Sequence, residues 1–174
     1  MPKFIDSPTD DVTNLLMRPN FDKCIRYRRL TAFFKPSVLK RWGKDSIEKL
    51  IDDDRDVILE IMIGGTDSSN IRMLDQLKNI DSQRAKEKFL EEYSHNIFEA
   101  AAGLDQPNSR DIQVNIIRYL VAKEKLKFKL SFAIFEGEYN LDHRKCGYFE
   151  EKNGDIVCFQ GSMNESDSAY MRHG

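Results

Sequence analysis

The stretch LDHRKCGYFEEKNGDIVCFQGSMNES, residues 141–166, decides the fold that we expect for this chain. At its centre Asn153-Gly154 stands between two strand-like runs, and this dipeptide is a strong hairpin signal because both residues accept a positive φ. With a two-residue loop, pairing runs outward from Lys152 opposite Asp155. Side chains alternate along a strand, so residues two apart share a face with their partners. This register predicts two facing pairs on one face: Lys145 with Ser162, and His143 with Asn164.

These four side chains are typical of a site for a tetrahedral anion such as a phosphodiester. Lys145 supplies a fixed positive charge, Ser162 and Asn164 supply neutral hydrogen-bonding groups, and the imidazole of His143 attacks phosphorus. Cys and carboxylate side chains are not set at metal-ligand spacing, so we expect no metal. The alternative is a surface hairpin with one exposed His and one exposed Lys, but the Gly-Ser-x-Asn in register favours the phosphodiester site.

The same residues resemble the motif of the phospholipase D superfamily, which reads His-x-Lys, then an acidic residue, then Gly-Ser-x-Asn. The matching positions are His143, Lys145, Gly161, Ser162 and Asn164, followed by Ser166. Glu150 stands where the family usually has Asp, so Glu165 and Asp142 stay open as the supporting acid. Two upstream segments also fit: residues 27–42 resemble the family's first strand and helix, and residues 56–65 its second strand with a glycine exit.

The closest similarity is to the bacterial nuclease-like branch, including modules of helicase-type and restriction proteins. The resemblance implies a phospholipase D-like fold and metal-independent cleavage of nucleic acid, with DNA favoured, through a phosphohistidine and without a cofactor. His143 would be the nucleophile in one subunit and the general acid in the other, and Lys145 would bind the non-bridging oxygens. Ser162 and Asn164 would hold the phosphate. Because only one His-x-Lys is present, the resemblance also implies a homodimer that brings two copies together.

Two rival functions stay open. The first is a non-catalytic nucleic-acid-binding or targeting module of the same fold, attached to a helicase or restriction assembly, which the departure at Glu150 favours. The second is a phosphodiesterase for lipids or small molecules. A lipid enzyme needs an exposed apolar entry surface, and the sequence does not clearly supply one.

The charge distribution bears on nucleic-acid binding. A net charge of −2 gives no general sign of it, but residues 24–44 hold seven basic residues and no acidic one. Such stretches can form a phosphate-neutralising surface on an otherwise acidic chain. The residues that we expect to bind substrate are Arg26, Arg28, Lys35, Lys127 and Lys129. The alternative is a set of solvated faces, balanced in three dimensions by residues such as Asp52, Asp53 and Asp54.

Strand-like and helix-like segments alternate along the chain. Residues 24–34 and 57–63 predict core strands, and KFKLSFAIF, residues 127–135, alternates strictly and predicts one half-buried strand, followed by a loop at 136–140. The middle of the chain is predicted to be helical. This alternation predicts an α/β fold, with a mixed sheet flanked by helices on both faces.

We expect a single domain, residues 1–174, because this length is enough to bury a core. The chain stops shortly after Ser166, which leaves open a truncation at the C-terminus and a larger protein with a helicase domain downstream. Apolar runs stay far below the length of a membrane span, and the N-terminus MPKFIDSPTDD has no secretory hydrophobic region. We therefore expect a cytoplasmic protein without a membrane partner.

The three cysteines are odd in number and widely spaced, at Cys24, Cys146 and Cys158. In the register above, Cys146 and Cys158 fall on opposite faces of the hairpin. We therefore expect no disulfide, and we expect the thiols to be buried.

Overall fold

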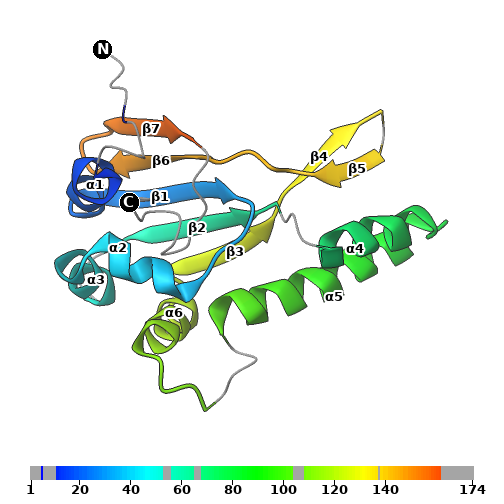
Figure 1. Ribbon diagram of the computed structural model, residues 1–174, viewed down its shortest axis with the longest axis horizontal. Coiled ribbons are helices and arrows are strands. Elements are labelled where there is room, and N and C mark those ends of the chain that lie inside the picture. Colours follow the sequence, from blue (N-terminus) through cyan, green and yellow to red (C-terminus); the bar gives the residue numbers. More distant parts are fainter. Residues whose placement is uncertain are drawn as a thin grey trace.

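The computed structural model describes residue 5 and residues 11–52, 56–64, 68–103, 108–136 and 138–161. Its centre is a five-stranded mixed sheet in the order β3-β2-β1-β6-β7 (Figure 1). The strands are β1 (Cys24–Thr31), β2 (Ile58–Ile63), β3 (Leu126–Leu130), β6 (Cys146–Glu151) and β7 (Ile156–Gln160). The first three run parallel, whereas β6 is antiparallel to β1 and β7 is antiparallel to β6. The predicted mixed α/β sheet is confirmed.

Helices fill the connections between the parallel strands. A π-helical turn (Thr13–Met17) and α1 (Arg18–Phe21) precede β1, and a 3-10 turn (Pro36–Val38), α2 (Leu39–Trp42) and α3 (Lys44–Ile51) join β1 to β2. Three longer helices join β2 to β3: α4 (Ser68–Lys78), α5 (Gln83–Ala102) and α6 (Ile112–Ala122). Two of these begin at side-chain caps, because Ser82 accepts from the Ala85 amide and Asp111 from the Gln113 amide.

The core lies on one face of the sheet. Phe21 of α1 packs edge-on against Phe149 of β6, and Tyr27 of β1 stacks on Phe149 at 4.7 Å between ring centroids. Trp42 of α2 and Ile117 of α6 are fully buried in the same cluster. Aromatic rings in such tilted and offset contacts add specific attraction to their burial, so they fix how these helices sit on the sheet.

The opposite face of the sheet is polar. Alternation along the strands puts six charged side chains there: Arg26, Arg28, Glu60, Lys127, Lys129 and Glu150. The apolar side chains of α1, α2, α3, α5 and α6 join the core on the first face, and α4 packs against α5 and β5. The prediction of helices on both faces is therefore wrong for the described part of the chain.

A second, two-stranded sheet projects beyond the first. The β4–β5 arm consists of β4 (Phe132–Phe135) and β5 (Glu138–Leu141), which pair antiparallel, and Figure 1 shows it beside α4, away from the main sheet. The prediction of one strand over 127–135 and a loop at 136–140 is wrong. The strand divides at Ser131, because β2 ends at Ile63, whose carbonyl accepts the Ser131 amide at 3.0 Å.

The β6–β7 hairpin is present, but its turn differs from the prediction. The Glu151 amide donates to Asp155 O at 2.9 Å, so the loop holds three residues, 152–154, rather than two. Only Gly154 takes a positive φ, +89°, and Asn153 instead accepts the Asp155 amide through its side chain. A three-residue loop with glycine in the left-handed region is the next most common hairpin connection. It shifts the register of the whole hairpin by one residue.

The cysteines follow from this register. Cys158 pairs with Tyr148, so it shares a face with Cys146, contrary to the predicted opposite faces. The three cysteines form no disulfide with one another, and only Cys24 is buried. The described residues contain no helix long and apolar enough to cross a membrane.

Candidate active site

His143 and Lys145 lie side by side just before β6. The Lys145 ammonium nitrogen is 3.2 Å from both ring nitrogens of His143 and donates to the His143 carbonyl oxygen at 2.9 Å. Lysine is a donor only, and only the neutral imidazole offers an acceptor nitrogen. At most one of the two 3.2 Å contacts is therefore a hydrogen bond to the ring, and both place the ammonium charge directly beside a side chain that can act as a nucleophile.

The segment that carries this pair crosses the carboxyl ends of the parallel strands. Gly64, directly after β2, packs so closely against the Asp142 backbone that a Cβ there would lie 1.7 Å from the Asp142 carbonyl oxygen. Only glycine permits this approach. In open α/β sheets, ligands bind outside the carboxyl ends of the strands, so the pair lies at the edge where a site is expected.

Asp142 fixes this segment through its carboxylate. The residue is buried, with 2 % of its surface exposed. The carboxylate accepts from Ser131 Oγ at 2.8 Å, from Arg144 Nη2 at 2.7 Å and from Arg144 Nε at 2.9 Å. These bonds, those to Arg144 foremost, lower the pKa of Asp142 to about 2. We refer to Asp142, Ser131 and Arg144 as the Asp142 clamp.

Arg29 adds a buried positive charge to the site. It lies on the core face of β1, opposite Gly147, and its guanidinium carbon is 4.8 Å from the centroid of the Phe159 ring. Burial lowers the pKa of the Lys145 ammonium, and the charge of Arg29 lowers it further. Two cations in one place favour an anion between or beside them.

Sequence reasoning treated Arg29 as part of a basic stretch and did not place it in the site. One signal could have found it: Arg29 is two residues from Tyr27, so it shares the buried face of a central strand. An arginine is seldom found on such a face, because a buried charge is costly unless it is paired with an opposite charge or hydrogen-bonded.

The observed hairpin register changes the predicted facing pairs. Cys146 pairs with Gln160, and the Gly161 amide donates to the Lys145 carbonyl at 2.9 Å. The predicted pairing of Lys145 with Ser162 is therefore wrong by one residue, since Gly161 is the residue opposite Lys145. Ser162, Asn164 and Glu165 lie outside the described residues, which end at Gly161.

Glu150, the predicted supporting acid, lies elsewhere. Its neighbour Phe149 points into the core, so Glu150 points to the polar face, where it binds Arg26 at 3.2 Å. It is also roughly 17 Å from Lys145 at the usual rise of an extended strand. Of the two other acids that the sequence left open, Glu165 lies outside the described residues, and Asp142 precedes His143 and holds its segment.

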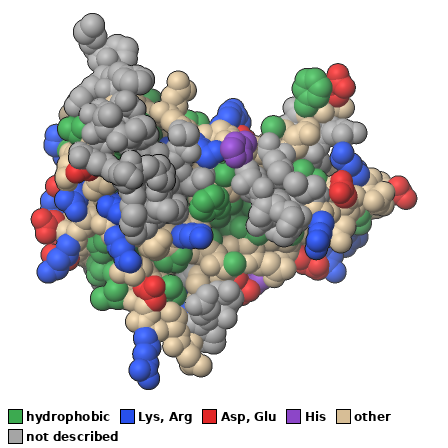
Figure 2. Space-filling model, viewed as in Figure 1, with side chains coloured by type: hydrophobic (Ala, Val, Ile, Leu, Met, Phe, Trp, Pro, Cys, Tyr) green, Lys and Arg blue, Asp and Glu red, His purple; other side chains and the backbone are tan. Residues whose placement is uncertain are grey.

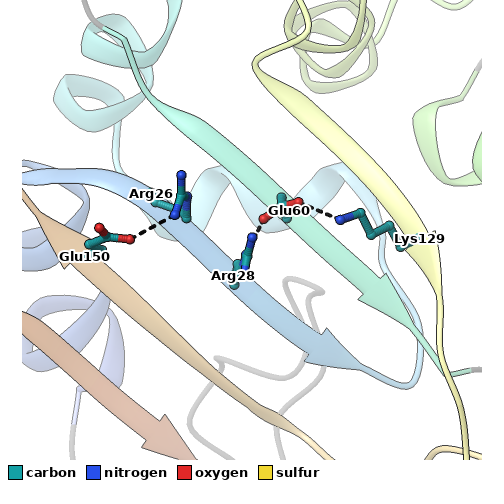
Figure 3. Close-up of polar contacts among 5 residues, drawn as sticks. All are labelled: Arg26, Arg28, Glu60, Lys129 and Glu150. Atoms are coloured by element: carbon teal, nitrogen blue, oxygen red, sulfur yellow. Dashed lines mark hydrogen bonds and ion pairs between the residues drawn. The ribbon is translucent and has the colours of Figure 1, made fainter.

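Most of the predicted substrate-binding cations are paired with carboxylates on the polar face. Figure 3 shows Glu150, Arg26, Arg28, Glu60 and Lys129 following one another across β6, β1, β2 and β3. Glu60 binds Arg28 and, at 2.7 Å, Lys129. Lys35 lies over the Phe33 ring, and Lys127 is exposed. Among the described residues this balance matches the alternative of solvated faces, with Glu60 and Glu150 as the partners; Asp53 and Asp54 lie outside the described part of the chain.

Charges of both signs are also mixed on the face shown in Figure 2, where Lys and Arg side chains alternate with Asp and Glu. Of the other two histidines, His95 is exposed on α5 and contacts Glu99 at 3.2 Å, and His173 lies outside the described residues. Within the described ranges, His, Cys, Asp and Glu side chains do not gather in groups of three or more that could hold a metal ion.

An open groove of about 510 Å³ lies between α5 and the end of β3. It is lined mainly by apolar side chains, among them Leu90, Phe98, Phe128 and Phe132. It shares no residue with the His143–Lys145 pair or the Asp142 clamp.

Comparison of the chain with protein-family models, with curated proteins and with solved structures finds no match in any of the three. The arrangement of side chains at the carboxyl edge of the sheet is therefore the basis for an argument about function.

Proposed function

We propose that this protein is a metal-independent phosphodiesterase with a phospholipase D-like fold, which cleaves nucleic acid, most simply DNA, in the cytoplasm. The observation that carries the proposal is the contact of Lys145 with both ring nitrogens of His143 at 3.2 Å. It joins a nucleophile to a cation at the sheet edge where ligands bind. The buried charge of Arg29 close by adds to the attraction for a phosphate.

In this proposal the reaction has two steps. A ring nitrogen of His143 attacks phosphorus, a nitrogen–phosphorus bond forms, and the bond from phosphorus to the leaving oxygen breaks. The leaving oxygen takes a proton from a second imidazole. Water, deprotonated by that second imidazole, then attacks phosphorus and releases His143. Lys145 stabilises the negative charge that the non-bridging oxygens carry throughout.

The second imidazole would come from a second copy of the chain. Among the described histidines, His95 is exposed on α5 and bound to Glu99, so it does not belong to the His143 segment. A homodimer with a two-fold axis would place two copies of His143 and Lys145 around one phosphate. Ser162 and Asn164 would complete the site by binding phosphate oxygens, and a helicase domain beyond the C-terminus would supply the nucleic acid.

The test is hydrolysis of a chromogenic phosphodiester by the wild-type chain and by His143→Ala. We expect a loss of at least about a hundredfold in kcat for the variant, because a nucleophile is removed. EDTA should leave the wild-type rate unchanged. His95→Ala is the matched control, since this histidine is exposed on α5, and it should keep full activity.

Equal rates for the wild type and His143→Ala would refute the proposal. Salt-dependent DNA binding without turnover would instead select the non-catalytic binding module. Sedimentation equilibrium tests the proposed dimer separately, with twice the monomer mass as the expected result.

A further inference from the structure

We propose that Asp142 is the acidic positioning residue of the candidate site, an inference that rests on the proposed function. Its carboxylate touches neither the imidazole nor the ammonium in the described contacts. It fixes the backbone on either side of His143, so that the imidazole and Lys145 project together. Asp142 thus acts through the segment 142–145 and is not itself a catalytic residue.

Both oxygens of the Asp142 carboxylate are held by hydrogen bonds. Oδ2 accepts from the Ser131 hydroxyl and from Arg144 Nη2, and Oδ1 accepts from Arg144 Nε. It also accepts the Arg144 backbone amide at 3.3 Å, which closes a turn around His143. Charge-assisted bonds of this kind are stronger than neutral ones, and a buried acceptor leaves little freedom to its segment.

The carboxylate connects the His143 segment to the ends of β2 and β3. Ser131 follows β3, and its amide bonds to Ile63 at the end of β2, while Gly64 packs against the Asp142 carbonyl. The Asp142 clamp therefore ties the His143 segment to the carboxyl ends of two parallel strands. Sites carried by rigid elements keep their geometry to within a fraction of an ångström, which nucleophilic attack requires.

The carboxylate also occupies the neighbouring arginine. Arg144 stands between His143 and Lys145 in the chain, and its guanidinium is bound to Asp142 rather than to either of them in the described contacts. Lys145 is then left to contact the imidazole and the His143 carbonyl. Without the carboxylate, Arg144 would be released and would place a mobile guanidinium beside the pair.

The experiment compares Ser131→Ala and Ser131→Thr, because threonine keeps the hydroxyl that binds Asp142. It measures kcat and KM for the chromogenic phosphodiester, and amide hydrogen exchange of residues 143–146. For Ser131→Ala we expect kcat to fall roughly three- to tenfold with KM within about twofold, and exchange to accelerate about tenfold. Ser131→Thr should recover at least half of the wild-type kcat, and Ser94→Ala, which loses a hydroxyl on α5, should change neither quantity.

Unchanged kcat per folded molecule in Ser131→Ala, or a change in KM alone, would overturn the positioning role. Asp142→Asn should lower kcat further than Ser131→Ala, and a smaller effect would also count against the proposal. If the wild type itself has no activity, the proposed function fails, and amide hydrogen exchange alone tests whether the Asp142 clamp holds the His143 segment. Faster exchange of residues 143–146 in Ser131→Ala then supports the hold of the clamp on the His143 segment, and equal exchange refutes it.

Discussion

Gly147 makes room for the packing around Arg29. A Cβ at this position would lie 2.5 Å from the Arg28 carbonyl oxygen and 2.8 Å from Cζ of Phe159. We therefore expect Gly147→Ala to lower the free energy of unfolding by about 1–3 kcal/mol, the usual cost of overpacking. Urea denaturation measures this, with Gly161→Ala as the control because its Cβ would meet nothing within 4 Å. Equal midpoints for the two variants would contradict the expectation.

Lys145 gives the proposed reaction a characteristic dependence on pH. Burial and the charge of Arg29 lower the pKa of its ammonium, so the charge is lost as pH rises through a value below that of an ordinary lysine. We expect the rate of phosphodiester hydrolysis to fall on the alkaline side at that lower pH. Lys145→Arg should remove the fall, because arginine stays charged, whereas Lys88→Arg on α5 should not. An alkaline fall that survives in Lys145→Arg would assign it to another group.

At the scale of elements, sequence patterns predicted β1, β2 and the β6–β7 hairpin, because apolar alternation and the turn dipeptide are local signals. They missed the break at Ser131, which depends on where β2 ends and on the distant Asp142. They also missed the three-residue loop, since Asn153-Gly154 suits either turn and only tertiary pairing selects one.

The candidate site was predictable only where its signals are local in the sequence. The His-x-Lys spacing is local and was visible in the sequence. Arg29 and the Asp142 clamp required knowledge of which strands are neighbours, and the one-residue change in hairpin register placed Gly161 rather than Ser162 opposite Lys145.

For the molecule as a whole, the polar face of the sheet holds a chain of ion pairs centred on Glu60. The bond from Lys129 and that from Arg28 lower the pKa of the Glu60 carboxyl. Its stabilising contribution is therefore present above the ordinary glutamate pKa and is lost as pH falls through the lowered value. At pH 7 we expect Glu60→Gln to cost about 1–3 kcal/mol of unfolding free energy, since it leaves two cations without their partner.

Urea denaturation at several pH values tests this expectation, and the difference between wild type and Glu60→Gln should shrink on acidification. Glu150→Gln is the comparison, because its pair with Arg26 is more exposed and is worth less than about 1 kcal/mol. Equal losses for the two variants, or a difference that persists in acid, would show that Glu60 does not anchor the face.

The bond between Ser131 and Asp142 joins the two residues that flank the β4–β5 arm. A segment whose two ends are bonded to each other can change in length with little effect on the rest of the fold, because the entropic cost of closing a loop grows only slowly with loop length. We therefore expect the arm to tolerate the insertion or replacement of a peptide without disturbance of the main sheet. A replacement would need to preserve only the join at its base and the surface that β5 offers to α4.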